Sequence, residues 1–357
     1  MSAQAAEVCM GASSMKEVQK QLIGILILRV LQKYTDEDHG LTQQDILRHL
    51  KSAYDASCDR RTVVSNIAFL NALGYVIDRD EHGRYRLLSR QFEDAELRML
   101  IDSVLFSRTI SAEQAKALVG KLENLGTVYF ESRVAHVSNL PELQHSDNQQ
   151  VLGSIAAISD AIDDGKMIRF VYNRYGTDFR LHPAKRNPRD VTPYQMVANN
   201  GRYYMICYEE FHDDIVYYRI DRMTNVARVE VDGRSLSQIP GMENGLDLPR
   251  HMAEHFYMFS GKSSAIILRA KKESMGDLID WFGRDFLILE QDDTFVKIRV
   301  FCNENSMFYW ALQYGQSVEI LRPYTLRYRI FTALRDMEAR YAKMPEFGQG
   351  DCGRGDS

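Results

Sequence analysis

The sequence has few of the features that would indicate metal binding, redox chemistry or membrane insertion. Its five cysteines are an odd number, are widely spread and include no CxxC pair, so neither a zinc site nor a dithiol redox site is indicated. The longest apolar run, residues 22–28, includes Gly24 and is far shorter than the roughly 20 residues of a bilayer-spanning helix. We therefore expect a cytoplasmic protein without a membrane segment, a metal or another cofactor.

An excess of positive charge is also missing. The chain has 44 Lys and Arg residues against 49 Asp and Glu residues, a net charge of −5, so any contact with nucleic acid has to come from local basic patches. Its 357 residues favour two or three domains, because a single hydrophobic core does not ordinarily grow to that size. The overall prediction is an α+β protein of several domains.

Residues 15–90 are predicted to form a winged helix-turn-helix. Three helical stretches precede two short alternating segments, YVIDRD and RYRLL, around a turn that contains glycine. Thr42 and Asp59 are expected to cap the second and third helices, and Gly74 to end the third in a left-handed conformation. The third helix is expected to bury one apolar stripe, made of Val63, Ile67, Leu70 and Leu73.

The other face of this third helix carries side chains suited to DNA. In this fold the helix enters the major groove and the wing follows the backbone, and arginine and asparagine bind guanine and adenine edges. Residues 16–90 contain 12 Lys and Arg against 10 Asp and Glu. This small excess of positive charge allows two interpretations, a homodimer that binds DNA or a winged helix used for protein contacts. The predicted DNA-binding residues are Arg60, Arg61, Thr62, Ser65 and Asn66 on the helix, and Arg84 and Arg86 on the wing.

The middle of the chain changes to a periodicity of two. Residues 151–235 begin with a helix and continue in segments rich in Ile, Val, Tyr and Phe, which predicts a small antiparallel sheet or barrel. Its first strands are the most basic part of the chain, since residues 166–189 hold seven Lys and Arg and one acid, Asp178. A strand edge of that charge favours an anionic partner.

The remaining segments are predicted from helical and strand patterns. Residues 91–150 are expected to form a helical connector, and residues 236–260 a polar linker. Residues 261–342 follow the order βαββαβ with a final helix, which predicts a ferredoxin-like domain. Residues 343–357 are expected to be a disordered tail.

Two stretches of the middle domain, GRYYMICY and YYRIDRM, carry a resemblance to a known family. Tyr203, Tyr204 and Met205 occupy the Trp-Tyr-Leu signature of the bacterial WYL-domain transcriptional regulators, and residues 219–223 match the family's Arg-Leu-Asp-Arg-Ile strand. The likeness extends over residues 16–342 and includes the winged helix-turn-helix and a C-terminal extension.

The resemblance implies an Sm-like five-stranded barrel that senses a nucleic acid or a nucleotide-type ligand, coupled to a homodimeric DNA-binding end. Tyrosines beside a free arginine would stack on bases while the guanidinium meets phosphate; the alternative is an amphipathic rim of the barrel. Asp221 is expected to hold one arginine by a charge-assisted fork. The residues predicted to bind the ligand are Tyr194, Gln195, Arg202, Tyr204, Arg219 and Arg222.

The strand that carries two of these arginines has a predicted pair of faces. On an uninterrupted strand, side chains alternate between the two sides. Arg219 and Asp221 would then share one face, and Tyr218, Ile220 and Arg222 the other. The pattern does not say which face is open to solvent.

No catalytic residue is indicated. His251 and His255 have the spacing of one helical face, but Met252 stands where a zinc hydrolase needs glutamate, so both histidines are expected at the surface. We expect a ligand-responsive, sequence-specific DNA-binding transcriptional regulator that is not an enzyme. The alternative is an accessory protein that binds single-stranded RNA or DNA and modulates a partner enzyme, such as a phage-defence effector.

Overall fold

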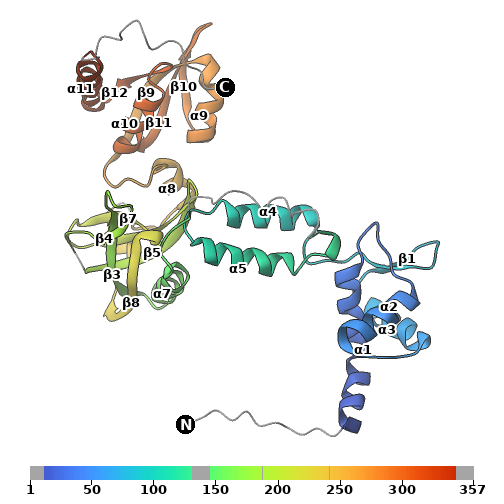
Figure 1. Ribbon diagram of the computed structural model, residues 1–357. Helices are drawn as coiled ribbons and strands as arrows, with labels where there is room; N and C mark the ends of the chain where they lie inside the picture. Colours follow the sequence, from blue (N-terminus) through green and yellow to red (C-terminus); the bar gives the residue numbers. More distant parts are fainter. Residues whose placement is uncertain (1–11, 131–144, 187, 241, 343–357) are drawn as a thin grey trace, which may run out of the picture. The chain divides into compact units, whose positions relative to one another are not determined.

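The computed structural model describes residues 12–130, 145–186, 188–240 and 242–342 (Figure 1). The predicted tail, residues 343–357, lies outside them. The chain divides into two units, one ending at Ser146 and the other beginning at Asp147. Within the described ranges, no helix is both long and apolar enough to cross a bilayer.

The first unit begins with three helices and a two-stranded hairpin, in the predicted order. These elements are α1 (Ala12–Tyr34), α2 (Gln43–Tyr54), α3 (Arg60–Ala72), β1 (Ile77–Arg79) and β2 (Tyr85–Leu87). The two strands pair antiparallel. Apolar side chains from the three helices and the hairpin meet in one core, which includes Ile27, Leu31, Ile46, Leu50, Val63, Ile67 and Leu87.

The predicted caps of α2 and α3 are confirmed. The Thr42 hydroxyl accepts a hydrogen bond from the Asp45 amide at 3.2 Å, and the Asp45 carboxylate accepts one from the Thr42 amide at 3.0 Å, which satisfies two N–H groups of the first turn. The Asp59 carboxylate accepts a bond from the Thr62 amide at 2.7 Å. Gly74 follows α3 with a φ of 98°, a conformation that a side chain would disfavour.

One residue of the predicted α3 stripe is not buried. Val63, Ile67 and Leu70 are at most 6% exposed, whereas Leu73 is 62% exposed. The prediction for Leu73 is wrong because the helix ends at Ala72, and a step of three residues from Leu70 already moves the side chain to the edge of the apolar stripe.

Two helices continue the first unit where a connector is expected. They are α4 (Asp94–Leu105) and α5 (Ala112–Glu123). Their contact is apolar and includes Leu97, Ile101 and Val119, and Phe130, which follows α5, packs in the same cluster. Each helix starts with a capping box, Glu93 with Glu96 and Ser111 with Gln114.

The second unit begins with a helix and a curled antiparallel sheet. The elements are α7 (Val151–Asp163), β3 (Lys166–Tyr175), β4 (Leu181–Pro183), β5 (Arg189–Asn199), β6 (Arg202–Glu209), β7 (Asp214–Arg219), the 3-10 turn η1 (Ile220–Arg222) and β8 (Met223–Asp232). The strand order is β4-β3-β5-β6-β7, and β8 also pairs with β3. Six strands thus take part where the resemblance implies five, because β4 pairs with the far end of β3.

The segment predicted as a polar linker is folded onto this sheet. It contains the 3-10 turn η2 (Leu236–Gln238) and helix α8 (Leu248–Glu254). Ile239 and Met258 are buried in one apolar core with Val197 of β5 and Ile206 of β6. The segment is therefore part of the packed second unit.

The C-terminal part follows the predicted order βαββαβ with a last helix. Its elements are β9 (Ser263–Lys271), the 3-10 turn η3 (Lys272–Ser274), α9 (Met275–Phe282), β10 (Leu287–Gln291), β11 (Phe295–Asn303), α10 (Glu304–Gln313), β12 (Val318–Arg322) and α11 (Tyr324–Tyr341). The strand order is β10-β11-β9-β12, with every neighbouring pair antiparallel. The core between sheet and helices includes Trp310, Leu268, Leu278 and Ile298.

Candidate functional site

The start of α3 presents the predicted DNA-reading residues unevenly. Arg60, Arg61 and Ser65 are exposed, and Thr62 is half-buried. The Asn66 amide nitrogen donates to the Thr62 carbonyl at 2.8 Å, and its oxygen lies beside Gly24 of α1, where a methyl group would come within 2.6 Å of it. The structure therefore places Asn66 against α1, apart from the two exposed arginines.

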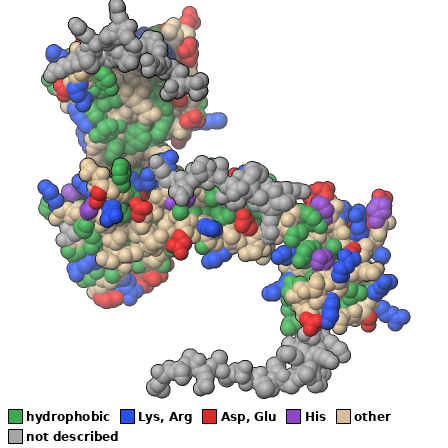
Figure 2. All heavy atoms as spheres, in the orientation of Figure 1, with side chains coloured by type: hydrophobic (Ala, Val, Ile, Leu, Met, Phe, Trp, Pro, Cys, Tyr) green, Lys and Arg blue, Asp and Glu red, His purple; other side chains and the backbone are tan. Residues whose placement is uncertain are grey.

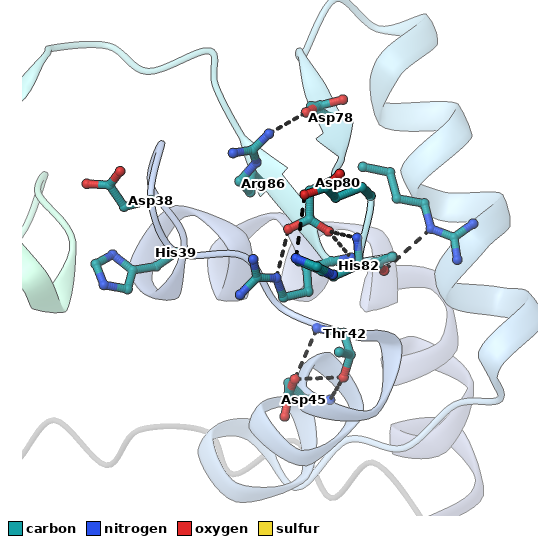
Figure 3. A network of polar contacts seen from close by, with 12 residues as sticks. Asp38, His39, Thr42, Asp45, Asp78, Asp80, His82 and Arg86 are labelled. Atoms are coloured by element: carbon teal, nitrogen blue, oxygen red, sulfur yellow. Dashed lines mark hydrogen bonds and ion pairs between the residues drawn. The ribbon is translucent and has the colours of Figure 1, made fainter.

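Both predicted arginines of the wing are engaged by carboxylates, and Figure 3 labels Arg86 with its partner Asp78 and also Asp80, the partner of Arg84. Arg84 Nε donates to Asp80 Oδ2 at 2.7 Å, and Arg86 Nη2 donates to Asp78 Oδ2 at 2.7 Å. The hydrogen bond from Arg86 holds the pKa of Asp78 below its ordinary value. A DNA phosphate would have to compete with a carboxylate for each arginine. Figure 2 shows the same mixture of signs, with basic and acidic side chains interspersed over this unit.

Arg79 is the wing cation that sequence reasoning missed. Its side chain is exposed, and its guanidinium carbon lies 5.5 Å from the centroid of the Tyr85 ring. It makes no ion pair with any residue that the structure describes. The sequence places Arg79 between Asp78 and Asp80, so only the structure shows that these two acids bind other arginines.

In the second unit, Asp221 gathers two of the predicted ligand arginines. Its carboxylate accepts two hydrogen bonds from Arg219, at 3.0 Å from Nε and 2.6 Å from Nη2, and one from Arg202 Nη1 at 3.3 Å. The Asp221 side chain is 1% exposed, whereas those of Arg219 and Arg202 are 16% and 26% exposed. Asp221 thus holds two arginines where one was expected, and both arginine side chains keep some contact with solvent.

This arrangement arises because β7 stops at Arg219. The next three residues, Ile220–Arg222, form the 3-10 turn η1, and β8 begins at Met223. The predicted alternation of faces is therefore wrong beyond Arg219. The tighter turn directs the Asp221 carboxylate back to the guanidinium of a residue only two positions earlier in the chain.

Tyr204 lies directly opposite Arg219 in the ladder between β6 and β7. Directly opposed residues of an antiparallel pair have their side chains on one face, about 5 Å apart. Burial raises the pKa of Tyr204, while the charges of Arg219 and Arg202 act in the opposite direction, so the phenol lies within electrostatic reach of both. We call Asp221, Arg219, Arg202 and Tyr204 the Asp221 cluster.

Arg222 lies beside Tyr175, the last residue of β3. Its guanidinium carbon is 5.9 Å from the ring centroid, and its Nε is buried without a hydrogen bond among the described residues. Burial raises the pKa of Tyr175, and the carboxylates of Asp147 and Asp221 act in the same direction. Tyr175 therefore borders the Asp221 cluster. Sequence reasoning missed it, although it stands inside the basic segment 166–189.

The other two predicted ligand residues have different surroundings. The Tyr194 hydroxyl donates to the Arg234 carbonyl at 2.7 Å, and burial raises the pKa of this phenol. Gln195 is exposed and lies opposite Ile206 of β6. A bulge between Pro193 and Gln195 shifts the register of β5 here, so alternation along the sequence does not give the directions of these side chains.

A second group of arginine and tyrosine side chains involves the last residue of β6. Glu209 is 2% exposed and accepts hydrogen bonds from Arg189 Nη1 at 3.0 Å and from the Tyr218 hydroxyl at 2.8 Å. The Arg189 guanidinium also lies 5.2 Å from the Tyr218 ring centroid. Part of the positive charge in the basic segment is therefore neutralised inside the sheet. Sequence reasoning missed Glu209, whose pairing depends on contacts between distant strands.

The expectation that His251 and His255 lie at the surface is wrong. They are 7% and 9% exposed, and their rings stack with centroids 4.6 Å apart. His251 Nε2 is hydrogen-bonded to the Tyr217 hydroxyl at 2.8 Å. The pair is buried because α8 packs on β7 at this point, and this burial lowers the pKa of His251 to about 4.

A comparison with protein families decides what the curled sheet is. A family model described as the WYL domain matches residues 153–228, a span that includes the whole Asp221 cluster. The chain contains a WYL domain. The resemblance carried by GRYYMICY and YYRIDRM is thereby confirmed, and the WYL domain here runs from α7 into β8.

Similar proteins were found among curated sequences and solved structures. YobV of Bacillus subtilis strain 168, described as an uncharacterized HTH-type transcriptional regulator, is 20% identical over 198 residues, which cover 55% of this chain and 58% of YobV. The chain thus spans little more than half the length of that relative. Proteasome accessory factor B/C (PafBC) of Arthrobacter aurescens has a TM-score of 0.29 at 15% identity, covering 93% of this chain and 55% of PafBC. A CRISPR Cas-related protein has a TM-score of 0.36 at 14% identity, covering 94% and 89%.

Proposed function

We propose that the protein is a ligand-responsive, sequence-specific DNA-binding transcriptional regulator that works as a homodimer, and that its WYL domain binds a nucleotide-type anionic ligand. The Asp221 cluster carries this proposal, because it holds two arginines with partly exposed side chains and a phenol together inside the matched domain. The similarity to an HTH-type transcriptional regulator supports the DNA-binding part.

The chemistry of the site favours a phosphate-bearing ligand. Arg202, Arg219 and Arg222 supply three guanidinium groups, while Asp221 supplies the carboxylate that binds two of them. The group keeps a positive charge, and a guanidinium matches phosphate oxygens in a bidentate way. Tyr175 adds a partly exposed ring on which a base can stack.

The first unit would bind duplex DNA with only a few exposed positive charges. Arg60 and Arg61 are exposed at the start of α3, the part of a recognition helix that meets base edges. The wing arginines at positions 84 and 86 are paired with acids, so one copy offers few unpaired cations. Because phosphate contacts supply much of the affinity, two copies on one duplex would bind far better than one.

Ligand binding and DNA binding would be coupled because the two DNA-binding units of the dimer can adopt different arrangements. The ligand would change the relative populations of these arrangements. A ligand shifts such an equilibrium only as far as it binds one arrangement more tightly than the other. The coupling is reciprocal, so the selected duplex should change the affinity for the ligand by the same factor.

The DNA-binding part is tested by selecting duplexes from a random library with the full chain, followed by anisotropy titrations at several salt concentrations. Replacement of Arg60 and Arg61 by alanine should weaken binding at least about tenfold and reduce the salt dependence. The matched control replaces Lys116 and Lys121 of α5, which removes the same charge elsewhere in the unit. Failure to select any duplex, or equal effects of both double variants, overturns this part and favours a winged helix used for protein contacts.

The ligand part is tested by calorimetric titration of the full chain with mononucleotides and with short single-stranded DNA and RNA. Arg219→Ala should lower the affinity for the ligand found at least about tenfold, because a charge-assisted contact is lost. Arg169→Ala is the control, since this arginine forms an exposed bidentate pair with Asp190 in the same domain. Equal affinity of both variants would remove the Asp221 cluster from the proposal. Binding of single strands without any duplex binding would favour the accessory role instead.

A further inference from the structure

Helix α11 has an apolar face that the described residues of its own domain do not cover. The face toward the sheet includes the fully buried Leu326 and the partly buried Ile330. On the remaining surface, five large side chains are between 49% and 70% exposed: Tyr324, Tyr328, Phe331, Leu334 and Tyr341. Hydrophobic side chains are also gathered on this domain in the view of Figure 2. A contiguous exposed apolar surface of this kind marks an interaction site.

The exposed face borders a cleft of about 600 Å³ between α11, α10 and β12. Its walls include Tyr324, Phe331 and Leu334 from α11, together with Ala311, Gly315 and Val318. The methyl group of Ala311 and the absence of a side chain at Gly315 leave space for an aromatic ring from outside. The cleft therefore extends the apolar surface beyond the helix itself.

The exposed residues of α11 repeat with the spacing of a coiled-coil seam. Alternate steps of three and four residues lead from position 324 to 327, 331, 334, 338 and 341, the a and d positions of two and a half heptads. We call these residues the α11 seam: Tyr324, Arg327, Phe331, Leu334, Glu338 and Tyr341. All six are exposed, so the seam lacks a covering helix in the described part of the chain.

The seam is complementary to itself in the antiparallel direction. With a two-fold axis between Thr332 and Ala333, Tyr324 faces Tyr341 of the partner subunit and Phe331 faces Leu334 of the partner subunit. Arg327 then faces Glu338 of the partner subunit, and the symmetry repeats every pair. A parallel arrangement would instead set arginine against arginine and glutamate against glutamate, which like-charge repulsion disfavours.

We propose that two copies of the chain pair through the α11 seam as antiparallel helices. The 18 residues of α11 span about 27 Å, so complete overlap brings all six seam positions into contact. Two Phe–Leu contacts lie next to the axis, two Arg–Glu pairs lie outside them, and tyrosines close both ends. Charge complementarity selects the second copy as occupant, because the same helix offers both members of each pair.

Arg327 is placed to serve this interface without losing its present contacts. Its Nη1 donates to the Ile320 carbonyl and its Nη2 donates to Glu319, each at 2.7 Å, yet the side chain is 44% exposed. A guanidinium has five N–H donors. It can therefore also donate a hydrogen bond to the carboxylate of Glu338 of the partner subunit.

This inference rests on the proposed function, because the dimer formed through the α11 seam would be the one that binds DNA with two copies of the first unit. It is measured without DNA, by sedimentation equilibrium of the full chain. We expect a dimer for the wild type. Arg327→Glu and Glu338→Arg should each weaken dimerisation at least about tenfold, and the double reversal R327E/E338R should restore it, because both ion pairs re-form with opposite polarity.

Two further variants keep the test decisive. Leu334→Glu, at an exposed position, should give a monomer even if Arg327→Glu does not fold, which circular dichroism will show. Arg340→Glu reverses a charge on α11 outside the seam and should leave the dimer unchanged. A monomeric wild type, or single reversals without effect on a dimer, overturns the inference; so does a double reversal that fails to restore a dimer weakened by both single changes. A dimer insensitive to every seam variant would leave the proposed regulator standing and place its interface elsewhere.

Discussion

Asp221 binds Arg219, two residues earlier in the chain, through both carboxylate oxygens, at 3.0 Å to Nε and 2.6 Å to Nη2. A pair of the same form, Asp190 with Arg169, has distances of 2.7 and 2.6 Å. The two pairs differ in burial, since the Asp221 side chain is 1% exposed and that of Asp190 is 41% exposed. Asp221 also accepts a hydrogen bond from Arg202, so the two pairs compare a buried carboxylate shared by two arginines with an exposed carboxylate that binds one.

Asp221→Asn should lower the free energy of unfolding by about 2 kcal/mol, because two guanidinium groups lose a buried anion. Asp190→Asn should cost less than about 1 kcal/mol, as exposed ion pairs do. Urea unfolding of the full chain, followed by circular dichroism, measures both. Similar losses in the two variants would show that the Asp221 cluster is not a specially stabilised centre.

Arg79→Ala should weaken duplex binding more than Arg84→Ala does. Arg84 is held by Asp80 at 2.7 Å, whereas Arg79 makes no ion pair within the described residues and can meet a phosphate without breaking one. We expect loss of Arg79 to reduce affinity about threefold and to lower the salt slope by about one unit. Anisotropy titrations with the selected duplex compare the variants, and a larger effect at Arg84 would contradict the idea.

Gly24→Ala should destabilise the first unit relative to Gly120→Ala. A methyl group at Gly24 meets the Asn66 oxygen at 2.6 Å, while one at Gly120 of α5 has nothing within 4 Å. Alanine at position 120 should stabilise by about 0.5–1 kcal/mol through helix propensity. At position 24 we expect the contact with the Asn66 oxygen to cancel this gain in stability. Thermal unfolding of G24A with and without Asn66→Ala checks the cause, because removal of the amide should return the gain.

The second unit should lose stability as the pH falls from about 6.5 toward 4. Burial, with a smaller effect of His255, lowers the pKa of His251 from 6.5 to about 4, so below pH 6.5 the unfolded chain binds a proton that the folded chain excludes. Linkage then gives a loss of about 2 kcal/mol between pH 7.5 and pH 5. His251→Gln should reduce this loss but not remove it, because burial also lowers the pKa of His255, whereas His82→Gln, on the exposed wing, should leave the loss unchanged. An unchanged curve in His251→Gln would show that the histidine titrates normally.

Local signals were sufficient for much of the helical structure. Thr42, Asp59 and Gly74 act within one turn of their own position, so their effects could be read from neighbouring residues. The predicted burial of Leu73 was wrong because the helix, and with it the helical periodicity, ends before this residue. His251 and His255 failed for a different reason, since their burial comes from Tyr217, which is more than 30 residues away in the chain.

The candidate ligand site was predicted only in part. Arg202, Tyr204 and Arg219 were predicted and do gather at Asp221. Tyr194 lies in a bulge of β5 and Gln195 follows it, so alternation along the sequence did not give the directions of their side chains. Tyr175 of β3 and Arg222 of the 3-10 turn η1 come together from positions that are distant in sequence.

The sequence by itself determined the order of the elements, the caps, and the chemical types available at each patch, because these depend on neighbouring residues and on period. Only the tertiary structure decided which charges remain available. It pairs Arg84 and Arg86 with acids, neutralises Arg189 inside the sheet, and leaves the α11 seam exposed among the residues that it describes. Charges and apolar faces act according to what lies within a few ångströms of them, and those neighbours come from distant parts of the chain.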